Sequence, residues 1–176
     1  MKNITISKAN PSDAKGIQML TVESSKGMYE LCGWSSKEIE DHFPPEKNKE
    51  GAERLRKNIP TFTEDDILFV AKDADDKVVG CCFANRQVNK NTIEAVYVLP
   101  EYQGLGLAKE LYDRACEYLN PNNDTYLDAF SLNSKAINFY KKQGFSETGK
   151  KTFDDRFIGS TGEKLEITEM RKIGVK

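Results

Sequence analysis

The stretch that decides the fold is EAVYVLPEYQGLGLAK, residues 94–109. It begins as an apolar strand, reaches Pro100, passes two closely spaced glycines, Gly104 and Gly106, and continues into an amphipathic helical pattern. In such a strand–turn–helix, the first free N–H groups of the helix and the positive end of its dipole point at one place. Glycine lets a bulky anion approach the backbone there. The stretch therefore predicts a pyrophosphate site, although an ordinary tight strand–helix turn would give the same local pattern.

The segments on both sides of this stretch alternate between strand and helix patterns. The order of these elements predicts a mixed α/β (α+β) fold. Residues 24–66 give only mixed helical fragments, broken by Gly33, by Pro44 and Pro45, and by Pro60. The predicted strands are 4–8, 67–71, 78–84, 92–99, 125–130, 145–153 and 164–172. One helix is predicted to start after Pro11, and two further helices are predicted over 105–119 and 134–142.

Length and charge limit the classes of protein to which this chain can belong. With 176 residues, the chain fits one domain over 1–176. Its 26 Lys and Arg residues against 28 Asp and Glu residues give a net charge of −2, so we expect no nucleic-acid partner. No apolar run approaches the ~18 residues of a membrane span, and the first residues lack the apolar region of a signal peptide. We therefore expect a cytoplasmic protein with no membrane partner.

The cysteines do not predict a metal site. Cys32, Cys81, Cys82 and Cys116 form no C-x-x-C pair, and His42 is the one histidine of the chain. A zinc site usually needs closely spaced Cys and His ligands, so we expect no metal. Reduced thiols are consistent with a cytoplasmic protein.

Two motifs resemble one known family. Residues 103–108, QGLGLA, match the Q/R-x-x-G-x-G/A signature of the GCN5-related N-acetyltransferase (GNAT) superfamily, and residues 133–145 resemble its N-x-x-A-x-x-F/L-Y-x-x-x-G-F motif. Residues 4–13 are similar to the family's first strand and helix start. The resemblance covers about residues 2–23 and 67–145. Within the superfamily, the chain is loosely similar to bacterial polyamine N-acetyltransferases. It implies the GNAT fold, a central, mostly antiparallel twisted sheet of about six to seven strands with flanking helices.

The resemblance also implies a co-substrate, acetyl-CoA, whose acetyl group would pass to a primary amine by direct attack in a ternary complex. The glycine-rich turn would hold the pyrophosphate, and the preceding strand would pair with the pantetheine arm, in a slot opened by a bulge and by splaying of the next strand. Leu105 stands where the family often has Lys or Arg, which removes one charge near the phosphates. The implied cofactor-binding residues are Val96, Val98, Gln103, Gly104, Gly106, Leu107, Ala108, Lys109 and Asn133.

Two residues are candidates for catalysis. The resemblance places Tyr140 near the sulfur of the cofactor, where its hydroxyl would protonate the departing thiolate, unless it is only a core aromatic. A primary amine with a pKa of ~10.4 is almost wholly protonated at neutral pH and must lose a proton. Strand alternation puts Glu94, Val96 and Val98 on one face, which makes Glu94 a candidate general base or, alternatively, a solvated carboxylate. Asn133 is also a natural N-cap for the helix that follows it.

Other interpretations stay open from the sequence. A Rossmann-type module would use Asp124 and Asp128 as ribose-binding acids, although Lys109 replaces the third glycine of its motif. A non-catalytic acyl-CoA sensor and a protein or peptide N-acetyltransferase are further alternatives. Residues 35–66 carry a net charge of −3, which favours a small cationic acceptor such as a polyamine. A homodimer is compatible with the sequence.

Four further residues of the unmatched segment bear on the acceptor. Tyr29, Trp34 and Phe43 could line a substrate pocket or pack a small core of their own. His42 reads as a surface residue at the end of a helix, next to the two prolines, rather than as a catalytic base.

Overall fold

The computed structural model describes residues 3–158, 161–162 and 164–175, with 154–158 described only as strand backbone; the ends of the predicted domain, residues 1, 2 and 176, lie outside the described residues. The strands are β1 (Thr5–Lys8), β2 (Asp66–Lys72), β3 (Val78–Arg86), β4 (Asn91–Val98), β5 (Thr125–Phe130), β6 (Ser146–Ile158) and β7 (Lys164–Lys172). The helices are α1 (Ala14–Leu31), α2 (Ser36–His42), α3 (Pro45–Asn58), α4 (Leu107–Cys116) and α5 (Ser134–Lys142).

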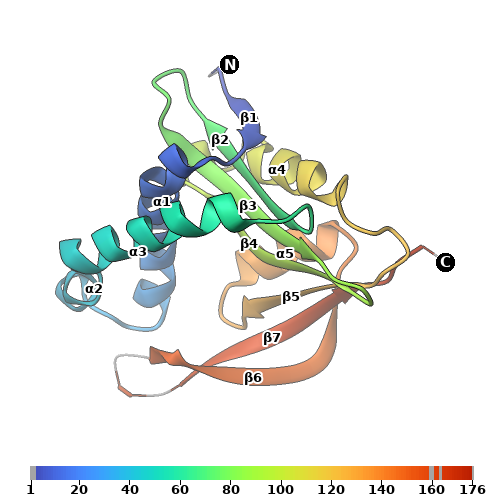
Figure 1. The fold of residues 1–176 in the computed structure, drawn as a ribbon. Coiled ribbons are helices and arrows are strands. Elements are labelled where there is room, and N and C mark those ends of the chain that lie inside the picture. Colours follow the sequence, from blue (N-terminus) through green and yellow to red (C-terminus); the bar gives the residue numbers. More distant parts are fainter. Residues whose placement is uncertain (1–2, 159–160, 163, 176) are drawn as a thin grey trace.

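The described strands form one sheet with the order β1-β2-β3-β4-β5-β7-β6. In Figure 1, α1, α2 and α3 lie in front of this sheet, and α4 and α5 lie behind it. Only β4 and β5 pair in parallel, and the other neighbouring strands are antiparallel. The predicted mixed α/β fold with a mostly antiparallel sheet is therefore confirmed. The Rossmann-type alternative is wrong, because its doubly wound sheet is mostly parallel.

Helix α1 begins where Pro11, Ser12 and Asp13 predict it. The Asn10 side chain accepts a hydrogen bond from Ser12 N at 2.9 Å, and the Asp13 carboxylate accepts one from Asn10 N at 2.8 Å. Asp13 also pairs with Lys72 of β2, at 2.6 Å between Oδ1 and Nζ, and both side chains are largely buried. A buried, hydrogen-bonded pair of this kind fixes the start of α1 against the sheet.

Residues 24–66, which the sequence gives only as fragments, are mostly helical. Helix α1 runs on to Leu31 and ends before Gly33, whose φ of 80° suits glycine. Ser35 and Glu38 form a capping box that starts α2, and Pro45 occupies the first turn of α3. The glycine and prolines that break the pattern are therefore the boundaries of ordinary helices.

A small aromatic core joins α1 to α2. Tyr29 lies 4.9 Å from Trp34 between ring centroids, and His42 lies 4.8 Å from Phe43. His42 Nε2 is 3.1 Å from the Tyr29 hydroxyl oxygen. Of the two interpretations of these aromatic residues, the structure supports the packed core. His42 does end a helix, as expected, but it is half-buried, and burial together with Lys47 lowers its pKa.

Two elements differ most from the sequence-based prediction in their boundaries. The helix predicted over 105–119 begins at Leu107, because Gly104 and Gly106 have φ values of 77° and 82°, in the left-handed region. It ends at Cys116, where the chain tightens into bonds between residues three apart, such as Leu119 N to Cys116 O. The strand predicted over 145–153 continues to Ile158. The predictions for α5 and β7 match the structure.

The contact between β4 and β5 is short. It pairs Asn91–Ile93 with Thr125–Leu127, and the described register contains no pair between these strands beyond Ile93. On its other edge β5 pairs with β7 along its whole length, from Thr125 to Phe130, and Figure 1 shows β5 and β7 running at a different angle from β2, β3 and β4. The two halves of the sheet therefore separate along the second half of β4.

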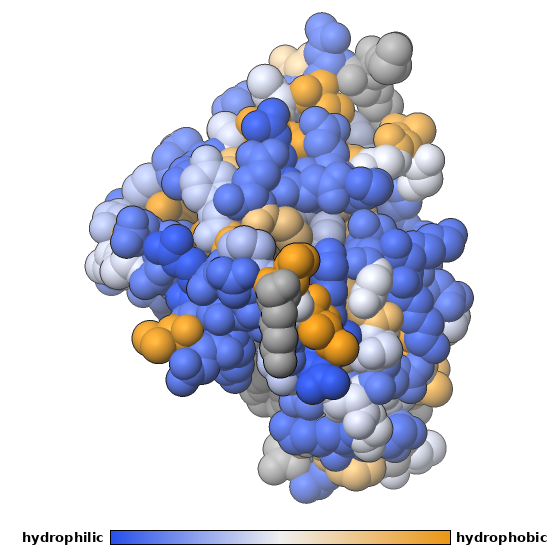
Figure 2. Space-filling model, turned by 90° about the vertical axis from the view of Figure 1, so that its right-hand side faces the viewer, coloured by the Kyte–Doolittle hydropathy of each residue, from blue (hydrophilic) through white to orange (hydrophobic). Residues whose placement is uncertain are grey.

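The face of the molecule drawn in Figure 2 shows no large apolar patch among the residues that the structure describes. On the side drawn in Figure 2, hydrophilic residues dominate and hydrophobic ones form small, separate patches. Such scattered patches are normal on a water-exposed surface. In the described part of the chain, no helix has the length and apolar character that crossing a membrane requires.

The lowered pKa of His42 predicts a pH dependence of stability. Below its ordinary pKa of 6.5, the unfolded chain binds the proton more readily than the folded one. The stabilisation by neutral His42 is therefore present above about pH 6.5 and is lost as the pH falls through the lower, folded-state pKa. His42→Gln keeps a polar side chain beside Tyr29 but does not titrate, so urea unfolding at pH 7.5 and 5.5 should give a smaller difference in this variant. An imidazole pKa at or above 6.5, measured by NMR on the one histidine, would contradict this account.

Candidate functional site

The free edge of β4 forms one wall of the candidate site. Leu99 N donates to Val79 O at 2.9 Å, so these two residues are a hydrogen-bonded pair of the antiparallel β3–β4 ladder. The alternating pattern then directs the backbone N–H and C=O groups of Val96 and Val98 away from β3, toward the side where β5 has separated. The gap between β4 and β5 is therefore lined by backbone groups able to pair with an extended ligand, and of these the Val98 carbonyl also accepts a hydrogen bond from the Gln103 side chain.

The strand is bulged at Glu94. Phe83 of β3 pairs with Ala95 and Ala84 pairs with Ile93, which leaves Glu94 without a partner. The prediction that Glu94 shares a face with Val96 and Val98 is wrong, because the bulge interrupts the alternation. Val98 faces α4 with Gly80, whereas Glu94 is exposed and accepts a 2.7 Å hydrogen bond from the Thr92 hydroxyl. The predicted bulge and the predicted splaying of the strands are both present.

The glycine-rich turn leads to the start of α4. A Cβ atom on Gly104 or Gly106 would meet nothing within 4 Å, so both glycines border open space. Glu110 N makes the first bond of the helix, to Gly106 O at 3.1 Å. The N–H groups of Leu107, Ala108 and Lys109 therefore precede that bond and point out of the helix end. This arrangement fits an anion, and the open space leaves room for a large one.

Gln103 links the turn to its surroundings. Its side-chain Nε2 donates to Val98 O at 2.9 Å, and its Oε1 accepts from the ammonium of Lys135 on α5. Lys109 instead forms an exposed ion pair with Asp113 at 2.5 Å. Lys135 was not among the residues predicted from the sequence. Its position next to Gln103 supplies a positive charge to a turn in which Leu105 carries none.

Asn133 caps α5. Its Oδ1 accepts a hydrogen bond from Ala136 N at 3.0 Å, so the capping role suggested by the sequence is confirmed. This bond uses the oxygen of the amide, and the NH₂ group stays chemically able to donate to a ligand. Gly144 ends the same helix with a φ of 91°.

Tyr140 lies on the inner side of α5. It is 8% exposed and packs against Phe139 and Phe145, with ring centroids 5.2 and 5.8 Å away. Burial raises the pKa of its hydroxyl, and the neighbouring Cys82 and Tyr97 raise it further. The phenol therefore stays protonated near neutral pH and can donate a hydrogen bond from an apolar environment.

Asp128 lies beside the gap, although the sequence suggested it only as a ribose-binding acid of the Rossmann-type alternative. Leu127 and Ala129 belong to the core, so Asp128 between them faces the opposite side of β5. It pairs directly with Glu169 of β7. Burial raises the pKa of Asp128, and the charges of Glu169 and Glu94 raise it further. The alternation of buried and exposed residues in 125–130 could have indicated this side chain, but its neighbours come from the pairing of distant strands.

The structure also has a cavity of about 540 Å³ between the start of α1 and the far end of β4. Several of its charged side chains already form ion pairs: Asp13 with Lys72, which lies outside the cavity lining, and Lys77 with Glu101 at 3.4 Å. None of the residues predicted from the sequence lines this cavity. We therefore place the candidate site at the gap between β4 and β5.

Comparison with known proteins agrees with this geometry. The model of the acetyltransferase (GNAT) family matches residues 23–145, which is more than half of the chain. The chain belongs to the GNAT family. The match contains β4, the glycine-rich turn and α5, and thus every predicted site residue.

Individual relatives are more distant. The chain is 30% identical over 101 residues to a peptidyl-lysine N-acetyltransferase, YjaB, of Salmonella typhimurium, covering 57% of this chain and 65% of that protein. It is 31% identical over 87 residues to the spermidine N(1)-acetyltransferase of Vibrio cholerae, covering 46% and 50%. The chain thus spans less than two thirds of these relatives. A solved structure of PaiA N-acetyltransferase from Thermoplasma acidophilum, in complex with coenzyme A, superposes with a TM-score of 0.66 at 23% identity, over 97% and 99% of the two chains.

The capping bond of Asn133 gives a prediction. Asn133→Ala removes the acceptor for Ala136 N and should lower the free energy of unfolding by about 1 kcal/mol. Asn133→Ser keeps an acceptor at the N-cap and should stay close to the original stability. Urea unfolding of the two variants measures both values, and equal stability of the alanine variant and the unchanged protein would contradict the capping role.

Proposed function

We propose that this protein transfers the acetyl group of acetyl-CoA to a primary amine of a small cationic molecule, by direct attack in a ternary complex. The observation that carries the proposal is the gap between β4 and β5. It has a glycine-rich helix start at one end and the carboxylates of Glu94 and Asp128 at the point where the strands separate. The two ends suit the two substrates, one anionic and one cationic.

The residues of the turn fit the anionic half of acetyl-CoA. The N–H groups of residues 107–109 would hold the pyrophosphate, in the open space beside Gly104 and Gly106. Lys135 would add a positive charge from α5. The backbone groups of Val96 and Val98 would pair with the pantetheine arm, and the NH₂ group of Asn133 would donate to it.

Tyr140 would stabilise the departing sulfur. Because its pKa is raised, complete transfer of its proton to a thiolate with an ordinary pKa of ~8.5 is unfavourable. A hydrogen bond from the phenol to the developing thiolate needs no complete transfer and still lowers the barrier. We propose this hydrogen-bonding role for Tyr140.

Direct attack is favoured over a cysteine relay. Burial raises the pKa of Cys81 to about 12, and it raises the pKa of Cys82 and of Cys116 as well. A nucleophilic cysteine needs appreciable thiolate at neutral pH, which these environments oppose. The amine nitrogen itself therefore attacks the acetyl carbon.

Two acceptor classes have support. A relative is named a spermidine N(1)-acetyltransferase, and the carboxylates of Glu94, Asp128 and Glu169 on one side of the gap suit a polycation. A second relative is named a peptidyl-lysine N-acetyltransferase, so a lysine side chain of a peptide is the second candidate. We propose the polyamine because several carboxylates can act on its several charges at once.

The placement of acetyl-CoA predicts the effect of a charge at Gly106. Gly106→Glu should abolish acetyl-CoA binding by calorimetry, because its carboxylate would lie at the anion site and repel phosphate. Gly106→Ala is the matched control, since it adds the same left-handed strain of roughly 1–2 kcal/mol without a charge. If the glutamate variant bound as tightly as the alanine variant, the placement would be wrong.

The acceptor assignment predicts a salt-sensitive substrate preference. Thiol release from acetyl-CoA should be faster with spermidine than with glycine or a lysine-containing peptide. The KM for spermidine should rise with ionic strength, because salt screens exposed carboxylates. A faster reaction with the peptide would favour the second candidate, whereas no release with any amine would favour an acyl-CoA sensor.

A further inference from the structure

We infer that Asp128, rather than Glu94, accepts the proton that the acceptor ammonium must lose before it attacks. This inference rests on the proposed acetyl transfer and names the proton acceptor of that same site. It starts from the strand geometry. Ile93 and Leu127 are the last paired residues of β4 and β5, and the next residues along the two strands are Glu94 and Asp128. Both carboxylates therefore stand where the gap opens.

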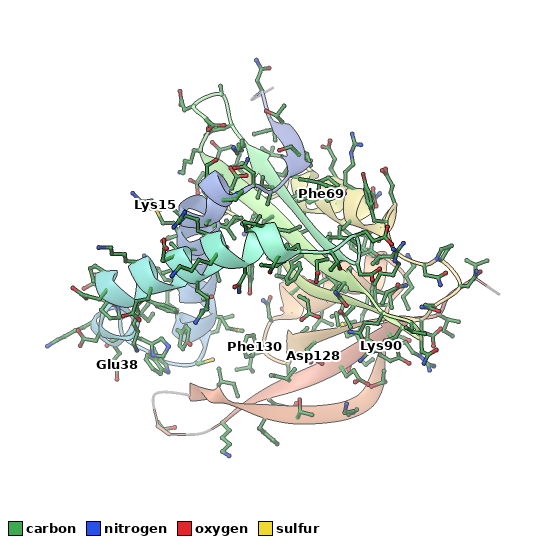
Figure 3. The ribbon with its side chains drawn as sticks, in the orientation of Figure 1. Lys15, Glu38, Phe69, Lys90, Asp128 and Phe130 are labelled. Carbon is green, nitrogen blue, oxygen red and sulfur yellow. The ribbon has the colours of Figure 1, made fainter. Side chains whose placement is uncertain are left out.

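The two carboxylates differ in how they are held. Glu94 is the bulged residue, is exposed, and accepts the hydrogen bond from Thr92. Asp128 lies in a regular part of β5 that pairs with β7 at every residue from Thr125 to Phe130. Figure 3 shows it between Phe130 and Lys90, in the region between β4 and β7. A group on a rigid, paired strand is better positioned for proton transfer than one on a bulge.

The charges around Asp128 favour its protonation. Burial is the largest cause of its raised pKa, and Glu169 of β7 and Glu94 of β4 act in the same direction. Lys150 of β6 and Lys90, just before β4, oppose them. A carboxylate that binds a proton more readily than usual is a better acceptor for the proton of an ammonium group. In this arrangement Glu94 acts through Asp128 and is a positioning residue.

The protons balance as follows. The acceptor ammonium gives one proton to the Asp128 carboxylate, and the neutral amine forms the new C–N bond with the acetyl carbon. The C–S bond breaks, the second proton leaves the nitrogen, and it ends on the sulfur of coenzyme A beside Tyr140. Asp128 then releases its proton to water. The net products are the acetylated amine, coenzyme A and one proton.

The test compares pH–rate profiles of the full-length protein with spermidine. Asp128→Asn should lower kcat by about 100-fold or more at pH 7 with unchanged acetyl-CoA affinity by calorimetry. The defect should shrink toward pH 10, where solvent supplies neutral amine. At saturating spermidine, Glu94→Gln should keep kcat within about threefold, with a higher KM for spermidine because one carboxylate is lost. It should also shift the acidic limb of the kcat profile to lower pH, because a charge that raises the pKa of Asp128 is gone. Glu166→Gln, on β7 and paired with Lys151 at 2.6 Å, is the control and should leave the profile unchanged.

The reverse pattern would overturn the inference: a 100-fold loss in Glu94→Gln with an unchanged profile in Asp128→Asn makes Glu94 the acceptor. If Asp128→Asn does not fold, NMR titration of the Asp128 carboxyl in the unchanged protein decides instead. A pKa above the ordinary value that falls in Glu94→Gln supports the inference, and a pKa at or below the ordinary value overturns it. If the unchanged protein acetylates no amine at all, the proposed function fails and the inference fails with it.

Discussion

The buried amide of Asn91 holds β4 to the loop before β5, and the site depends on this contact. Asn91 is 1% exposed, its Nδ2 donates to Asn120 O at 2.8 Å, and its Oδ1 accepts from Asn120 N at 3.2 Å. A buried amide that satisfies both its donor and its acceptor is strongly position-specific. It fixes one end of the parallel contact between β4 and β5, so the strands separate at a defined residue. The point of separation determines where the free edge of β4 begins. It thereby also determines the positions of the two carboxylates and of the glycine-rich turn relative to that edge.

Local signals in the sequence were enough to predict most helices and strands. The continuous apolar runs of β2 and β3, the helical period of α5 and the glycine at position 144 each depend on neighbours within a few residues, and the structure agrees with them. The glycine-rich turn was predictable because only glycine adopts the left-handed conformations of Gly104 and Gly106 readily. The capping box of Ser35 and Glu38 is also recognisable in the sequence, and it would have predicted the start of α2.

Other features needed the three-dimensional structure. The bulge at Glu94 is a property of the pairing between β3 and β4, and no residue within β4 marks it, so alternation gave the wrong face. The neighbours of Asp128 come from β4, β6 and β7, which are far apart in the sequence. The ammonium of Lys135 reaches the turn only because α5 packs next to it, as the bond to Gln103 shows. In each case a long-range contact determined what a local pattern could not.

The bulge also separates the two kinds of chemistry at the site. Val98, on the α4 side of the strand, shares its face with the core, whereas Glu94 and Asp128 lie on the other side, toward the charged groups of β6 and β7. In the proposed function, acetyl-CoA and a cationic amine would approach the same gap from opposite faces of the sheet. We propose a ternary complex rather than a relay through the protein, because neither substrate would have to leave before the other binds.

A crystal structure of the complex with coenzyme A tests the central claim most directly. We expect the pyrophosphate at the N–H groups of residues 104–109, the pantetheine arm along the free edge of β4, and the sulfur near the Tyr140 hydroxyl. Coenzyme A bound in the cavity between α1 and the far end of β4, or bound with β4 and β5 closed against each other, would contradict this claim.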